Sequence, residues 1–195
     1  MVEHDAFGER ERALENEYFR KKDLELIEKM RRAAATEQAQ VEMGQKTGLK
    51  DPALLKELQD LGFTPDTVAL LPLMPMLEVA WAEGEITAAE RQQLVRLARS
   101  RGIQEGDPAD RQLTTWMTER PTYAVFRSAT RLTAALLDSG SPSVVGDLSP
   151  EALVAYCEEI AAASGGLLGT RFMNVSAEER ELLARIASDL KARGT

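Results

Sequence analysis

In this 195-residue sequence, the side chains whose types and spacing best suit a functional site are three glutamates close to one glycine. Glu83 and Glu85 flank Gly84, and Glu90 follows closely. Carboxylate oxygens around a glycine turn can hold a divalent cation, although this loop is much shorter than the loop of about twelve residues in an EF-hand. Thr87-Ala88-Ala89-Glu90 is also a capping box, in which the glutamate bonds the backbone at a helix start. Glu83, Glu85 and Glu90 therefore have two interpretations: a divalent-metal site, or a helix cap with solvated neighbours, which is the commoner use of this spacing.

Histidine and cysteine offer little further chemistry. His4 is the only histidine and lies at the N-terminus, which argues against a histidine-based triad or a His-rich zinc site. Cys157 is the only cysteine, so no internal disulfide can form, and its alanine-rich surroundings predict a buried hydrophobe rather than a nucleophile. We therefore predict a non-enzymatic protein. An enzyme that uses carboxylates alone ranks last, because the sequence places no pair of acids in an evident cleft.

The charge and hydropathy of the chain exclude two classes of partner. A net charge of −8 argues against nucleic-acid binding, which needs a basic surface. The acidic N-terminus does not resemble a targeting segment. The longest apolar stretch, residues 68–82, is too short to span a bilayer and contains Pro72, Pro75 and Glu78, so we expect a buried core segment. These features predict a cytoplasmic protein without membrane insertion.

Helix signals punctuate the whole chain and predict an all-α fold of about eight helices. Asp51, Thr64, Asp107 and Ser149 each precede a proline, which is typical of an N-cap followed by the first helical residue. Residues 87–90 and 176–179 both read as capping boxes. Helix ends are expected at four glycines: Gly44, Gly62, Gly102 and Gly140.

An internal repeat is visible in the second part of the chain. Residues 78–84 align with 159–165, which pairs Glu78 with Glu159, and residues 86–91 align with 175–180. The match continues through Leu94/Leu183, Arg96/Arg185 and Ala98/Ala187. We expect two helix–loop–helix units within residues 51–195, related by a pseudo-twofold, because one such unit alone cannot bury its apolar face.

The first expected helix, residues 3–32, carries nine acids and eight bases but few apolar side chains. Such a helix buries little against its own protein. It can be a solvated helix, a coiled-coil arm that makes a homodimer, or a protruding helix that inserts Phe7, Tyr18 and Phe19 into a partner.

Residues 6–20 of this helix read AFGERERALENEYFR. They resemble the inhibitory segment of the mitochondrial ATP synthase inhibitor protein family, whose pattern is A-F-G-x-R-E-x-A-x-E-x-x-Y-F-R. In that family the helix wedges between subunits of the catalytic head and blocks rotation during ATP hydrolysis. The resemblance implies partner contacts by the following residues: Phe7, Arg10, Glu11, Glu15, Tyr18, Phe19 and Arg20. The family's histidine-bearing coiled coil has no counterpart here, so its pH response is not predicted.

Residues 77–91 read LEVAWAEGEITAAER. They are similar to the A-x-A-D-G-x-[IV]-[ST]-x-x-E signature of the TerB-like tellurite-resistance family, with Glu83 in place of the usual aspartate. That resemblance implies a compact helical domain, an acidic loop suggested to bind divalent metal, and a role in stress response. The sequence thus predicts an interaction helix in residues 1–45 and a TerB-like domain in residues 51–195. The leading hypothesis is docking on a protein partner, possibly ATP synthase catalytic subunits; the alternative is a metal-binding stress-response or scaffold module.

Overall fold

The computed structural model describes residues 35–138, 148–164 and 177–191. The chain divides into two compact units, residues 1–41 and residues 42–195. In the first unit the described residues 35–41 are helical. Helices α2 to α9 all belong to the second unit.

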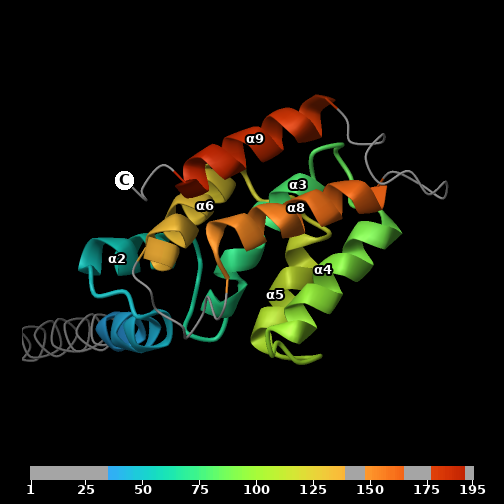
Figure 1. Cartoon of the computed structure of the whole chain (residues 1–195). Coiled ribbons are helices and arrows are strands. Elements are labelled where there is room, and N and C mark those ends of the chain that lie inside the picture. The colour runs from blue at the N-terminus through green and yellow to red at the C-terminus, as the bar shows by residue number, and fades with distance from the viewer. Residues whose placement is uncertain (1–34, 139–147, 165–176, 192–195) are drawn as a thin grey trace, which may run out of the picture. The chain divides into compact units, whose positions relative to one another are not determined.

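Every regular element in the described ranges is helical, which confirms the all-α prediction (Figure 1). Residues 42–47 are helical and lead into the labelled elements. These are α2 (Pro52–Asp60), the 3-10 helix η1 (Val68–Leu73), α3 (Met74–Ala80), α4 (Ala88–Ser100), α5 (Pro108–Trp116), α6 (Tyr123–Asp138), α8 (Pro150–Ser164) and α9 (Ala177–Lys191).

Most of the predicted helix starts that fall in the described ranges are confirmed, and several of the capping side chains make the expected local bonds. The Asp51 carboxylate accepts a hydrogen bond from the Ala53 amide at 2.8 Å. The Ser149 hydroxyl accepts one from the Ala152 amide at 3.1 Å. Both α5 and α8 begin at the proline that follows the predicted cap.

Two local predictions are wrong. Gly44 does not end its helix, which continues to residue 47 and stops before Gly48, a residue with φ of 74°. Thr64-Pro65 does not begin an α-helix but a turn that leads into η1. Pro72 lies inside η1 and Pro75 at the start of α3. Each proline lacks an amide donor and its ring crowds the preceding turn, so this stretch does not form one regular α-helix.

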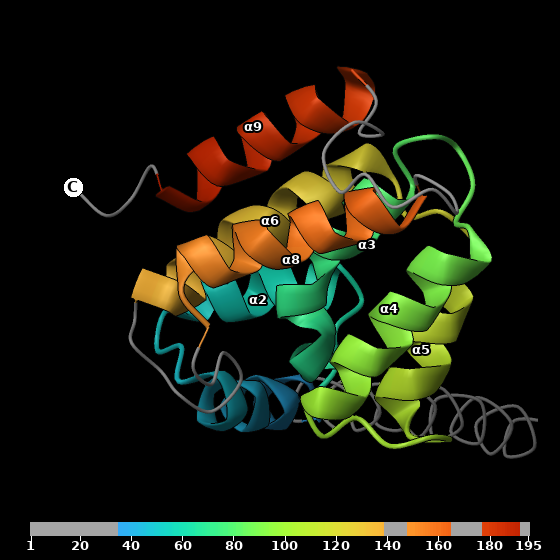
Figure 2. The ribbon, with the colours of Figure 1, turned by 45° about the vertical axis from the view of Figure 1, so that its right-hand side comes forward.

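The centre of the second unit is the segment formed by η1 and α3. Residues 70–81 are all buried, which confirms that the long apolar stretch is core. Helices α8 and α6 pack against α3, with α4 and α9 beside them (Figure 2). A helix covered on all sides has no polar face, which explains why the run is almost continuously apolar. Within the described ranges, no helix is both long enough and apolar enough to cross a membrane.

Candidate functional site

The predicted partner-binding residues lie outside the described residues. They are Phe7, Arg10, Glu11, Glu15, Tyr18, Phe19 and Arg20. Within the described residues, polar groups gather in three places: the acidic loop between α3 and α4, a second acidic turn between α4 and α5, and the buried polar groups of the helical core.

The acidic loop is a tight turn that keeps two of its three carboxylates in solvent. Gly84 has a φ of 95°, in the left-handed region that favours glycine. Its amide donates to the Trp81 carbonyl at 3.1 Å, which closes the turn after α3. Glu83 and Glu85 on either side are exposed.

Glu90 behaves differently, because it is buried and bonds the start of its own helix. Its Oε2 accepts hydrogen bonds from the Thr87 amide and the Thr87 hydroxyl, both at 2.8 Å. The Thr87 hydroxyl in turn accepts from the Glu90 amide at 3.3 Å. The capping-box interpretation of Glu90 is therefore confirmed.

The electrostatic surroundings of Glu90 are acidic. Burial raises the pKa of Glu90 above its ordinary value, and the two bonds from Thr87 oppose that shift. The carboxylates of Glu179 and Glu83 raise the pKa of Glu90 further. Glu179 is buried at the first turn of α9, the position that corresponds to Glu90 in the sequence repeat. In the part of the chain that the structure describes, no three His, Cys, Asp or Glu side chains gather in a group that could hold a metal ion.

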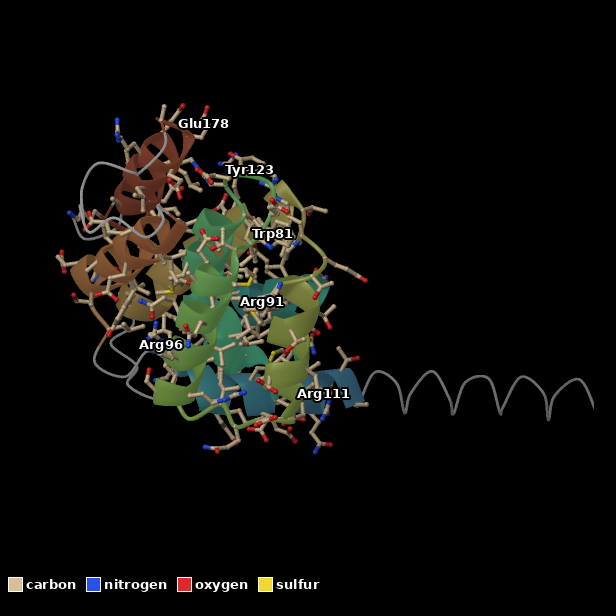
Figure 3. The ribbon with its side chains drawn as sticks, turned by 90° about the vertical axis from the view of Figure 1, so that its right-hand side faces the viewer. Trp81, Arg91, Arg96, Arg111, Tyr123 and Glu178 are labelled. Carbon is tan, nitrogen blue, oxygen red and sulfur yellow. The ribbon has the colours of Figure 1, made fainter. Side chains whose placement is uncertain are left out.

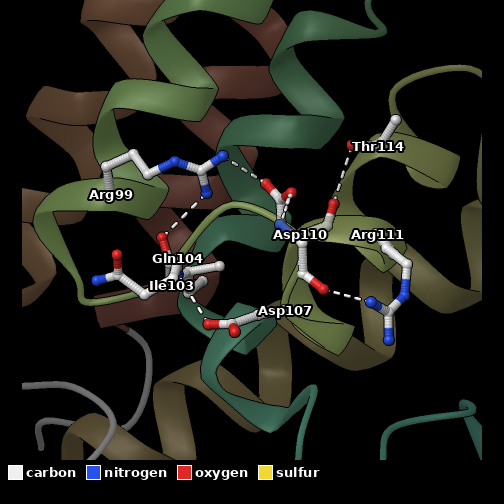
Figure 4. Close-up of polar contacts among 8 residues, drawn as sticks. Arg99, Ile103, Gln104, Asp107, Asp110, Arg111 and Thr114 are labelled. Atoms are coloured by element: carbon white, nitrogen blue, oxygen red, sulfur yellow. Dashed lines mark hydrogen bonds and ion pairs between the residues drawn. The ribbon is translucent and has the colours of Figure 1, made fainter.

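The turn between α4 and α5 is also rich in acids, and here the carboxylates accept hydrogen bonds from backbone amides (Figure 4). Asp107 Oδ2 accepts from the Gln104 amide at 2.9 Å, and Asp110 Oδ2 accepts from the Gly106 amide at 2.9 Å. Arg99 Nη2 donates to Asp110 Oδ1 at 2.7 Å. The Gly106 amide, and then Arg99, lower the pKa of Asp110. These acids therefore stabilise the turn between α4 and α5.

An ion pair between the buried Glu78 and the half-buried Arg185 joins α3 to α9, and the sequence alone did not predict it. Arg185 Nη2 donates to Glu78 Oε1, while Glu78 Oε2 and Arg185 Nη1 are buried and find no hydrogen-bond partner among the described residues. Burial raises the pKa of Glu78, and the bond from Arg185 opposes that shift. One signal was available: Glu78 is the only charged residue of the apolar run at 68–82 and needs a partner there.

The ring of Tyr123 lies beside Arg185, one of the two partners of this ion pair. The guanidinium carbons of Arg185 and Arg127 lie 5.3 Å and 5.8 Å from the centroid of its ring. The side chain is 57% exposed and sits at the start of α6 (Figure 3). A cation over an aromatic ring is a weak attraction at an exposed position. This weak attraction therefore links the start of α6 to the Arg185 side chain on α9.

Cys157 is fully buried in α8, as the sequence predicted. Burial raises the pKa of its thiol, and the charges of Glu78 and Glu158 act in the same direction. A thiol that stays protonated is a poor nucleophile.

Comparison with models of protein families, with characterised proteins and with solved structures finds no match to this chain.

Proposed function

We propose that this chain is a non-enzymatic regulatory protein whose N-terminal helix docks on a protein partner, the catalytic head of an F-type ATP synthase. The observation that carries the proposal is the sequence of residues 6–20, which meets every fixed position of the inhibitor-family pattern. The TerB-like domain that follows would present this helix to the partner.

The distribution of burial supports this proposal. Among the described residues, the first buried side chain is that of Met43. Residues 35–41 are exposed or half-buried, and Val41 is 59% exposed. The described core is thus built from residues 43 onward.

The residue types in the pattern also suit docking. Phe7, Tyr18 and Phe19 are aromatic anchors of the kind that dominate protein interfaces when they fill pockets. Arg10 and Glu11 carry opposite charges that can pair with complementary groups on the partner and fix the register.

The test is ATP hydrolysis by an isolated catalytic head in the presence of the full chain. We expect inhibition by the intact chain and loss of inhibition by the Tyr18→Ala, Phe19→Ala variant. Two interface aromatics removed together raise the half-inhibitory concentration at least ~30-fold, since one such anchor contributes about 2 kcal/mol or more. Asn16→Ala is the matched control, because the family pattern leaves that position open. Absence of inhibition by the intact chain would refute the ATPase assignment.

A pulldown separates the helix from the domain as the binding element. The full chain and a chain that begins at Ala35 are used as baits. Partner capture by the full chain alone supports docking through the N-terminal helix, whereas equal capture by both baits assigns binding to the domain.

The alternative places function in the domain, as a divalent-metal-binding stress-response or scaffold module. The acidic field that Glu83 and Glu179 create at Glu90 favours it. A cation there would have to compete with the Thr87 bonds to Glu90. Calorimetric titration with calcium, magnesium and zinc tests this alternative, with Glu83→Gln as the variant expected to weaken binding. No heat of binding at millimolar ion would reject it.

A further inference from the structure

A pocket of about 230 Å³ lies between α4 and α8. Its walls include Arg96 and Leu97 from α4, and Tyr156, Glu159 and Ile160 from α8. Ile160 is buried, Leu97 and Tyr156 are half-buried, and the two charged side chains are exposed. The pocket therefore has an apolar side and carries one charge of each sign on facing helices. Figure 3 labels Arg96 on α4.

The two charged side chains of the pocket do not form an ion pair with each other. The guanidinium of Arg96 and the carboxylate of Glu159 form no hydrogen bond or ion pair with any residue in the ranges that the structure describes. Arg99, one turn further along α4, is instead held by Asp110 and by the Ile103 carbonyl. Arg96 and Glu159 are thus available to a ligand.

The sequence repeat gives a second, independent observation on this pair. Arg96 aligns with Arg185, and Glu159 aligns with Glu78. In the α3–α9 half of the domain the aligned residues meet directly as an ion pair in which the glutamate is buried and the arginine half-buried. In the α4–α8 half the same two residue types stand on either side of a pocket. One copy of the arrangement is closed and the other is open.

We propose that this open copy binds a compact zwitterion of the amino-acid class. The ligand carboxylate pairs with the Arg96 guanidinium, whose planar fork suits a carboxylate, and the ligand ammonium pairs with Glu159. The ligand side chain packs against Leu97, Tyr156 and Ile160. The pocket volume of about 230 Å³ is below the size of drug-like pockets and suits a small metabolite.

The first test compares three ligands that share the same apolar side chain and differ in their charges. Leucine carries both charges, N-acetyl-leucine lacks the cation, and leucinamide lacks the carboxylate. Binding to the full chain is followed by chemical-shift changes of the isotope-labelled protein up to ~10 mM ligand, a range that detects millimolar Kd. We expect leucine to bind about 2- to 5-fold more tightly than either analogue, since an ion pair at an exposed position contributes up to about 1 kcal/mol.

The variants assign each charge to its partner. Arg96→Gln weakens the binding of leucine and N-acetyl-leucine about 2- to 5-fold and leaves the binding of leucinamide unchanged. Glu159→Gln weakens leucine and leucinamide and leaves N-acetyl-leucine unchanged. Glu158→Gln on the same helix and Arg120→Gln outside the pocket are the controls, and both retain wild-type affinity for all three probes. Because Arg96 and Glu159 are exposed, we expect their variants to fold, which circular dichroism checks.

Two outcomes overturn the proposal. One is the absence of shift changes at residues of α4 and α8 with leucine, and with methionine and phenylalanine as further probes. The other is binding of either leucine analogue as tightly as leucine itself, which would show that the pocket does not read both charges. ATPase inhibition by the N-terminal helix is a separate measurement, so either result leaves that proposal unchanged.

Discussion

Two buried glutamates illustrate how a single residue's role depends on its neighbours. Glu90 is 2% exposed and bonds Thr87 in its own first turn. Glu78 is 3% exposed and bonds Arg185, a residue 107 positions away in the sequence. Substitutions in a bond within one turn and in a bond between distant helices should change the free energy of unfolding differently, and unfolding experiments can measure this difference.

Replacing Glu90 tests the capping box. Glu90→Ala removes the acceptor for the Thr87 amide and hydroxyl, so we expect a loss of about 1 kcal/mol in the free energy of unfolding. Glu90→Gln keeps an acceptor oxygen and a capping-box residue type, and it removes the repulsion from Glu179 and Glu83. Denaturant unfolding at pH 7 should therefore place the Gln variant close to wild type and well above the Ala variant. Equal destabilisation by both would contradict the capping role.

The Glu78–Arg185 pair predicts an asymmetry between its two partners. Arg185→Leu leaves a buried carboxylate without its cation, which we expect to cost about 3 kcal/mol at pH 7. Glu78→Leu leaves Arg185, whose side chain is 28% exposed, able to reach solvent, and should cost only about 1 kcal/mol. In Arg185→Leu the pKa of Glu78 stays raised, so the stability of this variant increases as the pH is lowered from 7 to 5 and the carboxylate gains a proton. Urea unfolding at the two pH values measures both effects. A larger loss of unfolding free energy in Glu78→Leu than in Arg185→Leu would contradict the predicted asymmetry.

At the scale of the elements, helix starts and turns are stabilised by bonds that span a few residues. The α4–α5 turn shows this most clearly, since Asp110 receives the Gly106 amide and the Arg99 guanidinium together. By contrast, α3 has no side-chain cap. Its position comes from burial on all sides.

The α4–α5 turn yields a prediction of pH dependence. The pKa of Asp110 is lowered in the folded protein, so its contribution to stability is present above the ordinary pKa of about 3.9 and is lost as the pH falls through the lowered value. Asp110→Asn should lose about 1–2 kcal/mol at pH 7, with a smaller difference from wild type below pH ~3. The comparison uses chemical unfolding at the two pH values.

Asp60→Asn serves as the control for this experiment. Asp60 forms an exposed i,i+4 ion pair with Lys56, at 2.7 Å, with 62% of its side chain accessible. Such pairs contribute well under 1 kcal/mol. A pH effect of the same size in both variants would show that Asp110 has no special role.

For the whole molecule, the core of the described residues begins at Met43 and continues to Leu190. We predict that a chain beginning at Ala35 keeps the free energy of unfolding of the full chain to within about 1 kcal/mol, because substitutions and removals outside a core rarely change stability more. The shortened chain retains the helical residues before Met43. Thermal and urea unfolding of the two chains measure this, and a loss of cooperative unfolding in the shorter chain would contradict it.

The sequence by itself determined the all-α class, most of the helix starts and the buried nature of residues 70–81. These follow from interactions within a few residues and from the length of an apolar run, which are readable along the chain. It did not predict the 3-10 geometry of η1, because two prolines altered a segment with helical spacing.

Only the tertiary structure decided which charges meet. Three of these encounters involve helices that are far apart in sequence. They are the bond between Glu78 and Arg185, the proximity of Glu179 to Glu90, and the pocket that lies between Arg96 and Glu159. The aligned residues of the repeat are chemically equivalent, yet one pair is closed and the other open. The physical reason is that α3 is surrounded by other helices and buries Glu78, whereas α8 leaves Glu159 at the surface.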